Sequence, residues 1–216
     1  MLNETSINPS CPIYIPVESF VPISHQHKEG SGRSGGTIIY VNENILHEVR
    51  PVFTNFQVKL SQSCAIEIGG TKIYSMYRSP SQEPPDMLIW TDETTKILLN
   101  EKNVIIGDLN LHIDWSELNT NENKYKNILD NIIMENITQH VRGNTFKTST
   151  NTLDVVLTKS KNLIHSTRIL KDWNADGVDH YPILAKLFKK TKTLTNAKIY
   201  TRKHKNVKSY LALVST

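Results

Sequence analysis

The sequence predicts a layered α/β or α+β sandwich in which many strands are interspersed with few helices. Short runs of apolar and β-branched residues, bounded by Gly, Pro, Asn or Asp, recur along the first 188 residues, as expected for strands. Few stretches are helical in pattern, and they lie between the strands. A chain of 216 residues is also long enough to bury a core without the help of disulfide bonds.

Four strands are expected before residue 80, at 37–41, 53–60, 64–68 and 72–77. The first of them follows a Gly-rich loop and is almost entirely β-branched, which is typical of a buried strand. Gly69 and Gly70 separate the last two strands and predict a tight hairpin turn.

Two helices are expected in the second part of the chain. Asp86 follows two prolines and is suited to cap a helix that runs to about residue 100. The second helix is predicted by apolar residues at i, i+3, i+4, i+7 and i+8, namely Tyr125, Ile128, Leu129, Ile132 and Ile133. Further strands are expected at 103–106, 153–157, 163–170 and 183–188.

Composition excludes several classes of protein. The longest apolar runs, such as 87–90, are far too short to cross a bilayer, so no membrane partner is expected. Two cysteines, Cys11 and Cys64, exclude a disulfide scaffold and a four-cysteine zinc site. Residues 1–4 lack the basic and apolar regions of a signal peptide, so the protein is expected to be intracellular and not secreted.

Charge is distributed unevenly along the chain. The formal net charge is +4, from 25 basic and 21 acidic residues, but nine of the basic residues lie between Lys186 and Lys208. Subtracting those nine leaves 16 basic against 21 acidic residues, or about −5, for residues 1–185. A basic tail either contacts a phosphate backbone or serves solubility alone. Residues 1–188 are therefore expected to form the domain and 189–216 a basic linker or tail.

Polar side chains of the kinds that perform acid–base chemistry gather at predicted strand ends. Asp108 and Asn110 follow a buried strand and share one face of the sheet edge. An acid inside an apolar strand, Asp154, needs a partner, and an Asp beside an imidazole raises its basicity. The remaining members of this set are Tyr77, Arg78, Asp179 and His180.

Each of these residues also has a purely structural explanation. Asp108 and Asn110 are turn formers, Asp154 can pair with a surface lysine, and His180 can cap backbone groups. His25 and His27 have a metal-ligand spacing, but no third ligand lies near them in sequence, so they are expected to be loop histidines on the surface.

Six motifs, taken in order, carry a resemblance to a known family. They are Asn3-Glu4-Thr5, the Gly-Gly-Thr-Ile-Ile-Tyr-Val run at 35–41, the Tyr-Arg-Ser-Pro-Ser run at 77–81, the Ile-Gly-Asp-Leu-Asn run at 106–110, the run at 152–158 around Asp154, and the Val-Asp-His-Tyr-Pro-Ile run at 178–183. The chain resembles the endonuclease/exonuclease/phosphatase superfamily over residues 1 to about 188. It is most similar to the apurinic-type endonuclease domain of the reverse transcriptases of non-LTR (LINE-like) retrotransposons.

The resemblance implies a four-layered α/β sandwich, two packed mixed sheets flanked by helices, and a divalent metal, normally Mg²⁺ with Mn²⁺ as a substitute. By resemblance, Glu4 binds the metal, Asp179 lies beside it, and Tyr77 contacts the scissile phosphate. Asp108 and Asn110 position the attacking water and a phosphate oxygen. Asp154 orients His180, which binds the phosphate or transfers a proton, and either Asp108 or His180 is the base.

The sequence departs from the family pattern in three places. The chain starts three residues before Glu4, so the family's first strand and helix are expected to be missing and the domain to be truncated. Val178 replaces a usual serine, which removes a hydrogen-bond donor near the site. Leu109 replaces a usual aromatic residue, a substitution that packing tolerates. The reverse-transcriptase domain that the family carries in cis is absent from the 216 residues.

Three functions follow from this reading. The first is a Mg²⁺-dependent endonuclease that hydrolyses DNA phosphodiester bonds, with nuclear action implied by the resemblance. The second is a truncated or domesticated remnant with weak or no catalysis that binds nucleic acid, DNA or RNA. The third is a phosphodiesterase or phosphatase of the same fold acting on another phosphoester. Candidate contacts to nucleic acid are Arg33, Arg78, Lys189 and Lys190.

Overall fold

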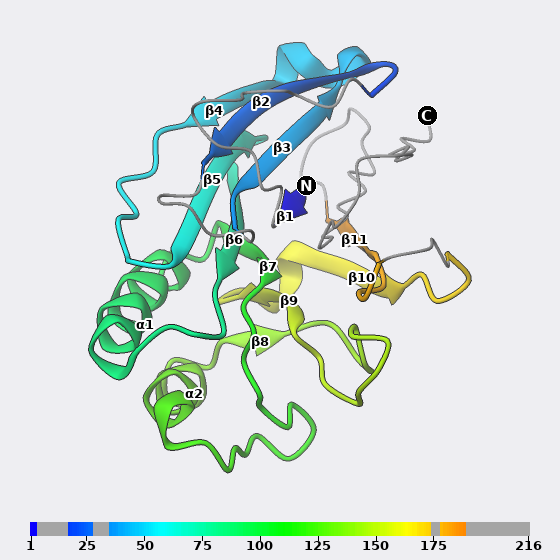
Figure 1. Ribbon diagram of the computed structural model, residues 1–216. Coiled ribbons are helices and arrows are strands. Elements are labelled where there is room, and N and C mark those ends of the chain that lie inside the picture. Colours follow the sequence, from blue (N-terminus) through cyan, green and yellow to red (C-terminus); the bar gives the residue numbers. More distant parts are fainter. Residues whose placement is uncertain (4–16, 28–34, 174–177, 189–216) are drawn as a thin grey trace.

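A six-stranded mixed sheet forms the centre of the computed structural model, which describes residues 1–3, 17–27, 35–173 and 178–188 (Figure 1). Its strand order is β4-β5-β6-β7-β9-β8. All neighbouring strands in it are antiparallel except β6 and β7, which are parallel. The strands are β4 (Val49–Val52), β5 (Ser61–Ile68), β6 (Thr71–Arg78), β7 (Asn103–Asp108), β8 (Thr138–Gln139) and β9 (Asp154–Thr158).

Two smaller antiparallel ladders cover one face of this sheet. The first has the order β1-β3-β2 and consists of β1 (Leu2–Asn3), β2 (Phe20–Gln26) and β3 (Thr37–Asn42). The second pairs β10 (Ile164–Ile169) with β11 (Ile183–Leu187). Buried polar bonds join the layers, among them Thr37 Oγ1 to Ser75 Oγ at 2.5 Å.

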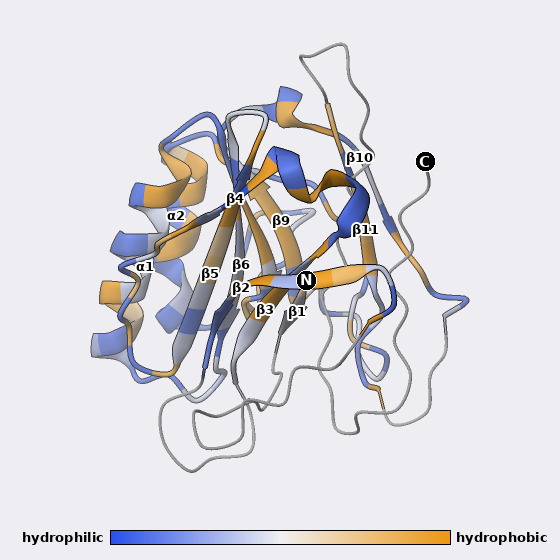
Figure 2. Ribbon diagram, turned by 90° about the horizontal axis from the view of Figure 1, so that it is seen from above, coloured by the Kyte–Doolittle hydropathy of each residue, from blue (hydrophilic) through white to orange (hydrophobic). Residues whose placement is uncertain are grey.

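Two helices cover the opposite face. Seen from above, α1 (Pro84–Leu98) and α2 (Lys126–Met134) lie on one side of the central sheet, and β1–β3, β10 and β11 lie on the other (Figure 2). Three short 3₁₀ segments complete the described elements, at Glu43–Glu48, Asn123–Tyr125 and Lys161–Leu163. The described layers are thus helices, the central sheet, and the two ladders, which confirms the predicted α/β sandwich.

The two-residue period of the strands divides the core into two halves. In β7, Ile105 packs toward the helices, whereas Val104 and Ile106 pack toward the two ladders. In β9, Val156 faces the ladders and its neighbours Val155 and Leu157 face the helices. A strand that is buried on both faces reads as a continuous apolar run, which is why these segments were recognisable in the sequence.

Most predicted elements are found within one to three residues of their expected ends. The hairpin at Gly69 and Gly70 is confirmed, since both have positive φ, 57° and 77°, as a tight two-residue turn requires. On the second helix, the predicted apolar face is buried except for Ile133, which is 46% exposed. Among the described residues, no helix has the length and apolar character needed to cross a membrane.

Three local predictions were wrong. The segment 53–60 is not a strand, because Leu60 has a positive φ of 60° and Phe56 and Val58 pack into the helix-side core from a loop. Glu83, rather than Asp86, is the residue that precedes helix α1. His25 lies on strand β2, not in a loop, and its ring centroid is 4.6 Å from that of His27.

Candidate active site

The strand period brings three of the predicted residues onto one face. Asp108 lies two residues after Ile106 and Asp154 lies two residues before Val156, so both carboxylates point toward the two ladders, as those apolar residues do. The two aspartates are direct partners across β7 and β9. The parallel register of β6 and β7, continued by two residues, sets Tyr77 beside Asp108.

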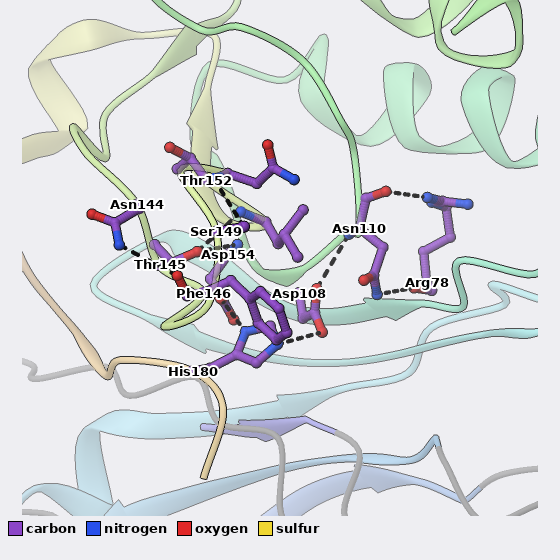
Figure 3. Close-up of polar contacts among 12 residues, drawn as sticks. Arg78, Asp108, Asn110, Asn144, Thr145, Phe146, Ser149, Thr152, Asp154 and His180 are labelled. Atoms are coloured by element: carbon purple, nitrogen blue, oxygen red, sulfur yellow. Dashed lines mark hydrogen bonds and ion pairs between the residues drawn. The ribbon is translucent and has the colours of Figure 1, made fainter. Parts of the chain in front are cut away.

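His180 joins this pair from the segment that leads into β11. Its Nδ1 atom lies 2.5 Å from Oδ2 of Asp154, and its Nε2 atom lies 4.0 Å from Oδ2 of Asp108 (Figure 3). Asp108, Asp154 and His180 are each 1% exposed or less. We call them the Asp-Asp-His cluster. Their burial strengthens the electrostatic interactions within the cluster, because little water screens the charges.

A loop that the sequence reasoning did not single out holds this cluster in place. The hydroxyl of Thr145 accepts hydrogen bonds from the backbone N–H of Leu153 at 2.9 Å and of Asp154 at 3.0 Å. The next residue, Phe146, forms a β-bridge with His180 and an edge-on ring contact at 4.9 Å. Thr and Phe in a loop are common, and only the fold shows that these two fix the ends of the Asp154–His180 pair.

Asn110 is held in a constrained turn directly after β7. Its φ of 48° is left-handed, a conformation that asparagine tolerates better than most residues. Its backbone N–H donates to Oδ1 of Asp108 at 3.2 Å, and its side-chain Nδ2 donates to the carbonyl oxygen of Arg78 at 2.8 Å. The turn therefore ties Asn110 both to the carboxylate of Asp108 and to the end of strand β6.

Arg78 is completely buried, which corrects the prediction that it contacts nucleic acid. Its guanidinium donates to the carbonyl oxygens of Leu109 at 2.6 Å, Asn110 at 2.6 Å and Ser79 at 2.9 Å. The rings of Trp90 and Tyr125 lie 5.7 and 5.3 Å from its central carbon. Burial lowers the pKa of Arg78 from its usual value, against the raising influence of Tyr125 and Asp108. Its donors are committed to the turn after Asp108, so it supports the site from behind.

The remaining predicted site residues fall into two groups. Asp179 precedes His180 and is partly buried, and its carbonyl oxygen accepts a hydrogen bond from the backbone N–H of Lys147 at 2.8 Å. Glu4, Arg33, Lys189 and Lys190 lie outside the described residues.

A cleft of about 800 Å³ opens between the loop that follows Asp108 and the loop that precedes Asp154. His112 and Asp114 line it, together with Arg142, Gly143 and Thr152 on the facing loop. The loops are joined by the indole N–H of Trp115, which donates to the carbonyl oxygen of Thr152 at 3.1 Å.

The donor atoms of the Asp-Asp-His cluster suit a bound cation. One ligand atom from each of the three residues lies within 4.8 Å of the other two. Among the described residues, this is the group of three or more His, Cys, Asp or Glu side chains that lies close enough together to hold a metal ion. Two buried carboxylates on neighbouring strands repel each other unless positive charge lies near them. Carboxylate oxygens are also the ligands that hard divalent cations prefer.

Comparisons with known proteins identify the family and the fold. The endonuclease-reverse transcriptase family matches residues 71–184, whereas no curated protein matches the sequence. Among solved structures, the endonuclease domain of TRAS1, a telomere-specific non-LTR retrotransposon, is 13% identical, with 74% of this chain and 75% of that chain covered and a TM-score of 0.54.

Two further solved structures are more distant. Humanized D. rerio TDP2 is 13% identical over 79% of this chain and 77% of that chain, with a TM-score of 0.45. An endonuclease/exonuclease/phosphatase family protein from Leptotrichia buccalis is 13% identical over 80% of this chain and 73% of that chain, with a TM-score of 0.45. The family match covers 114 of 216 residues and includes β6, β7, β9 and the whole Asp-Asp-His cluster. This chain therefore belongs to the endonuclease-reverse transcriptase family.

Proposed function

We propose that this protein is a divalent-metal-dependent endonuclease that nicks DNA by hydrolysing a phosphodiester bond. The observation that carries the proposal is the buried arrangement in which His180 lies between two carboxylates. Its Nδ1 atom is 2.5 Å from Oδ2 of Asp154, and its Nε2 atom is 4.0 Å from Oδ2 of Asp108. Membership of a family named for its endonuclease, and a fold like that of a retrotransposon endonuclease domain, support DNA as the substrate.

Asp154 fixes the orientation of the His180 ring. Because an ionised carboxylate only accepts hydrogen bonds, we assign the proton of this hydrogen bond to Nδ1 of His180, with Asp154 as the acceptor. Nε2 then faces Asp108 across 4.0 Å, a separation that a water molecule can bridge. The pair thus presents one ring nitrogen to the substrate in a fixed direction.

Asp108 and Asn110 act on the attacking water. Asp108 takes up a proton from the water as it attacks the phosphorus atom in line with the leaving oxygen. Asn110 is held by the carbonyl oxygen of Arg78 and by its own turn, and it positions the water and a phosphate oxygen next to Asp108. In its doubly protonated form, His180 donates from Nε2 to a phosphate oxygen on the opposite side, and Tyr77 contacts the phosphate from the neighbouring strand.

By the family resemblance, Glu4 and Asp179 would hold a Mg²⁺ ion beside the Asp-Asp-His cluster, because each offers the carboxylate oxygens that Mg²⁺ prefers. When bound, the ion would neutralise charge that develops on the phosphate and the leaving oxygen. Asp108 and His180 are each 1% exposed, so a DNA phosphate reaches them only if the side chains around them rearrange.

Nicking of a supercoiled plasmid tests this proposal. We expect nicked circles to accumulate with Mg²⁺ and to be absent with EDTA, and restored Mg²⁺ to restore nicking. Parallel assays with bis(p-nitrophenyl) phosphate and p-nitrophenyl phosphate separate a diesterase from a phosphatase, and only the diester should be cleaved. Nicking that persists in EDTA, or cleavage of the monoester alone, would contradict the proposal.

A further inference from the structure

Two lysines from different parts of the chain converge on one tyrosine ring next to the Asp-Asp-His cluster. Nζ of Lys147 lies 5.7 Å from the ring centroid of Tyr181, and Nζ of Lys171 lies 6.0 Å from it. Tyr181 directly follows His180 in the chain. We call Lys147, Lys171 and Tyr181 the lysine–tyrosine surface.

Backbone bonds fix this surface relative to the cluster. The N–H of Tyr181 donates to the carbonyl oxygen of Thr145 at 2.8 Å, and that of Lys147 donates to Asp179 at 2.8 Å. The backbone N–H of Leu170, which precedes Lys171 in the chain, donates to the carbonyl oxygen of Pro182 at 2.9 Å. The same segments that position His180 therefore also position both lysines.

Bringing two ammonium groups to one ring costs free energy, because like charges repel. Asn144 offsets part of this cost, since its Oδ1 accepts from Nζ of Lys171 at 2.9 Å. The carboxylate of Asp172, which follows Lys171 in the chain, lies 3.8 Å from the guanidinium of Arg168. The phosphates of a nucleic-acid backbone would bring negative charge to both ammonium groups and so offset the repulsion further.

The stretch of the chain that contains Lys147 and Lys171 is more basic than the stretch that contains the two helices. Residues 140–173 contain six Lys or Arg and two Asp, a formal charge of +4, whereas residues 83–135 contain four Lys and eleven Asp or Glu, a formal charge of −7. The acidic stretch includes α1 and α2, which lie on the opposite side of the central sheet from β10 of the basic stretch (Figure 2). Lys159 of the basic stretch lies apart from β10, since it pairs with Glu135 after α2 at 2.9 Å. The pKa of His140 is lowered to about 4, by burial first and then by Arg142 and Lys161.

We propose that the lysine–tyrosine surface holds the phosphodiester backbone of duplex DNA next to the scissile bond. This inference rests on the proposed function and adds to it the side on which the DNA lies. The two ammonium groups contact backbone phosphates, Tyr181 keeps them apart, and helices α1 and α2 lie on the far side of the central sheet from the DNA. These contacts depend on charge and not on base sequence.

The test measures binding and not cleavage, so it does not depend on catalysis. Fluorescence anisotropy of a labelled 20-base-pair duplex, in EDTA, gives the binding constant at a series of salt concentrations for the parent and for the Lys147→Gln/Lys171→Gln double variant. We expect the double variant to bind roughly tenfold more weakly at low salt and its log–log salt slope to fall by about 1.8, or about 0.9 for each lost phosphate contact.

A matched control pair carries the same charge change on the helix side. The Lys102→Gln/Lys126→Gln variant replaces two exposed lysines, and its salt slope should equal that of the parent. A Lys147→Arg/Lys171→Arg variant keeps both charges and should keep the slope. An unchanged slope in the Gln double variant, an equal fall in the control pair, or no binding by the parent would each overturn the inference.

Hydrolysis of bis(p-nitrophenyl) phosphate separates this inference from the proposed function. That small diester has no extended backbone, so the Gln double variant should hydrolyse it within about twofold of the parent rate. If the parent hydrolyses no phosphodiester, the proposed function fails, and the salt slopes still decide whether DNA lies over the lysine–tyrosine surface. A loss of small-diester hydrolysis in the folded double variant would show that the two lysines act within the site.

Discussion

Replacing Asp154 by asparagine is expected to slow phosphodiester hydrolysis by roughly 10²–10⁴-fold, the usual contribution of a positioned acid or base. Asp154 and Asn have nearly the same shape, but an amide can donate as well as accept, so it no longer fixes which nitrogen of His180 carries the proton. The hydrogen bond of 2.5 Å to Nδ1 then ceases to present Nε2 toward Asp108.

The rate is measured in single-turnover assays with Mg²⁺, and circular dichroism and thermal unfolding report whether the variant is folded. A charge-assisted hydrogen bond contributes about 1.5–3 kcal/mol, so the Asp154→Asn variant should remain folded but be less stable. Asp130→Asn, on the exposed face of α2, is the matched control and should leave the rate unchanged. A folded Asp154→Asn protein that keeps more than a tenth of the parent rate would show that Asp154 does not orient the catalytic ring.

Replacing Arg78 by methionine is expected to reduce the free energy of unfolding by about 3 kcal/mol or more. The change leaves the carbonyl oxygens of Leu109, Asn110 and Ser79 without the guanidinium donors, and each buried polar group that loses its partner costs roughly 1–3 kcal/mol. It also removes a cation that lies near the rings of Trp90 and Tyr125.

Urea unfolding followed by fluorescence measures this loss. Arg78→Lys keeps the charge but lacks the planar guanidinium that donates to several carbonyl groups at once. Its stability should therefore lie between those of the parent and Arg78→Met. In Arg78→Lys the catalytic rate constant should fall more than the Michaelis constant changes, because the turn that holds Asn110 loosens. An Arg78→Met protein within 0.5 kcal/mol of the parent would mean that the turn after Asp108 holds its shape without the guanidinium.

The sequence pattern placed the carboxylates and the histidine at strand ends, because each lies on or next to an apolar strand. Their grouping into one site was implied by the family resemblance. Side chains alternate between the two faces of a strand, so the positions of Asp108 and Asp154 relative to their apolar neighbours predict which face each occupies. Strand β2 was missed because its sequence includes Pro22 and polar residues, and its burial is only partial.

The role of Arg78 could not be predicted, because an arginine after a strand is usually exposed. Its burial depends on the loop after Asp108 wrapping over it and on two aromatic rings that are 12 and 47 residues away in the chain. The lysine–tyrosine surface is a similar case. Lys147, Lys171 and Tyr181 come from three separate segments, and only the completed sheet arrangement brings their side chains to one place.

The most direct test of the central claim, that the Asp-Asp-His cluster hydrolyses DNA phosphodiester bonds, is the Mg²⁺-dependent nicking rate of the parent and of Asp108→Asn measured side by side on a supercoiled plasmid. Asp108→Asn preserves the shape of the side chain and removes the carboxylate that we propose takes the proton from water. The account predicts nicking by the parent and at least a roughly 100-fold slower rate for the variant. Equal nicking by the two folded proteins would contradict the account and would place the reaction elsewhere in the molecule.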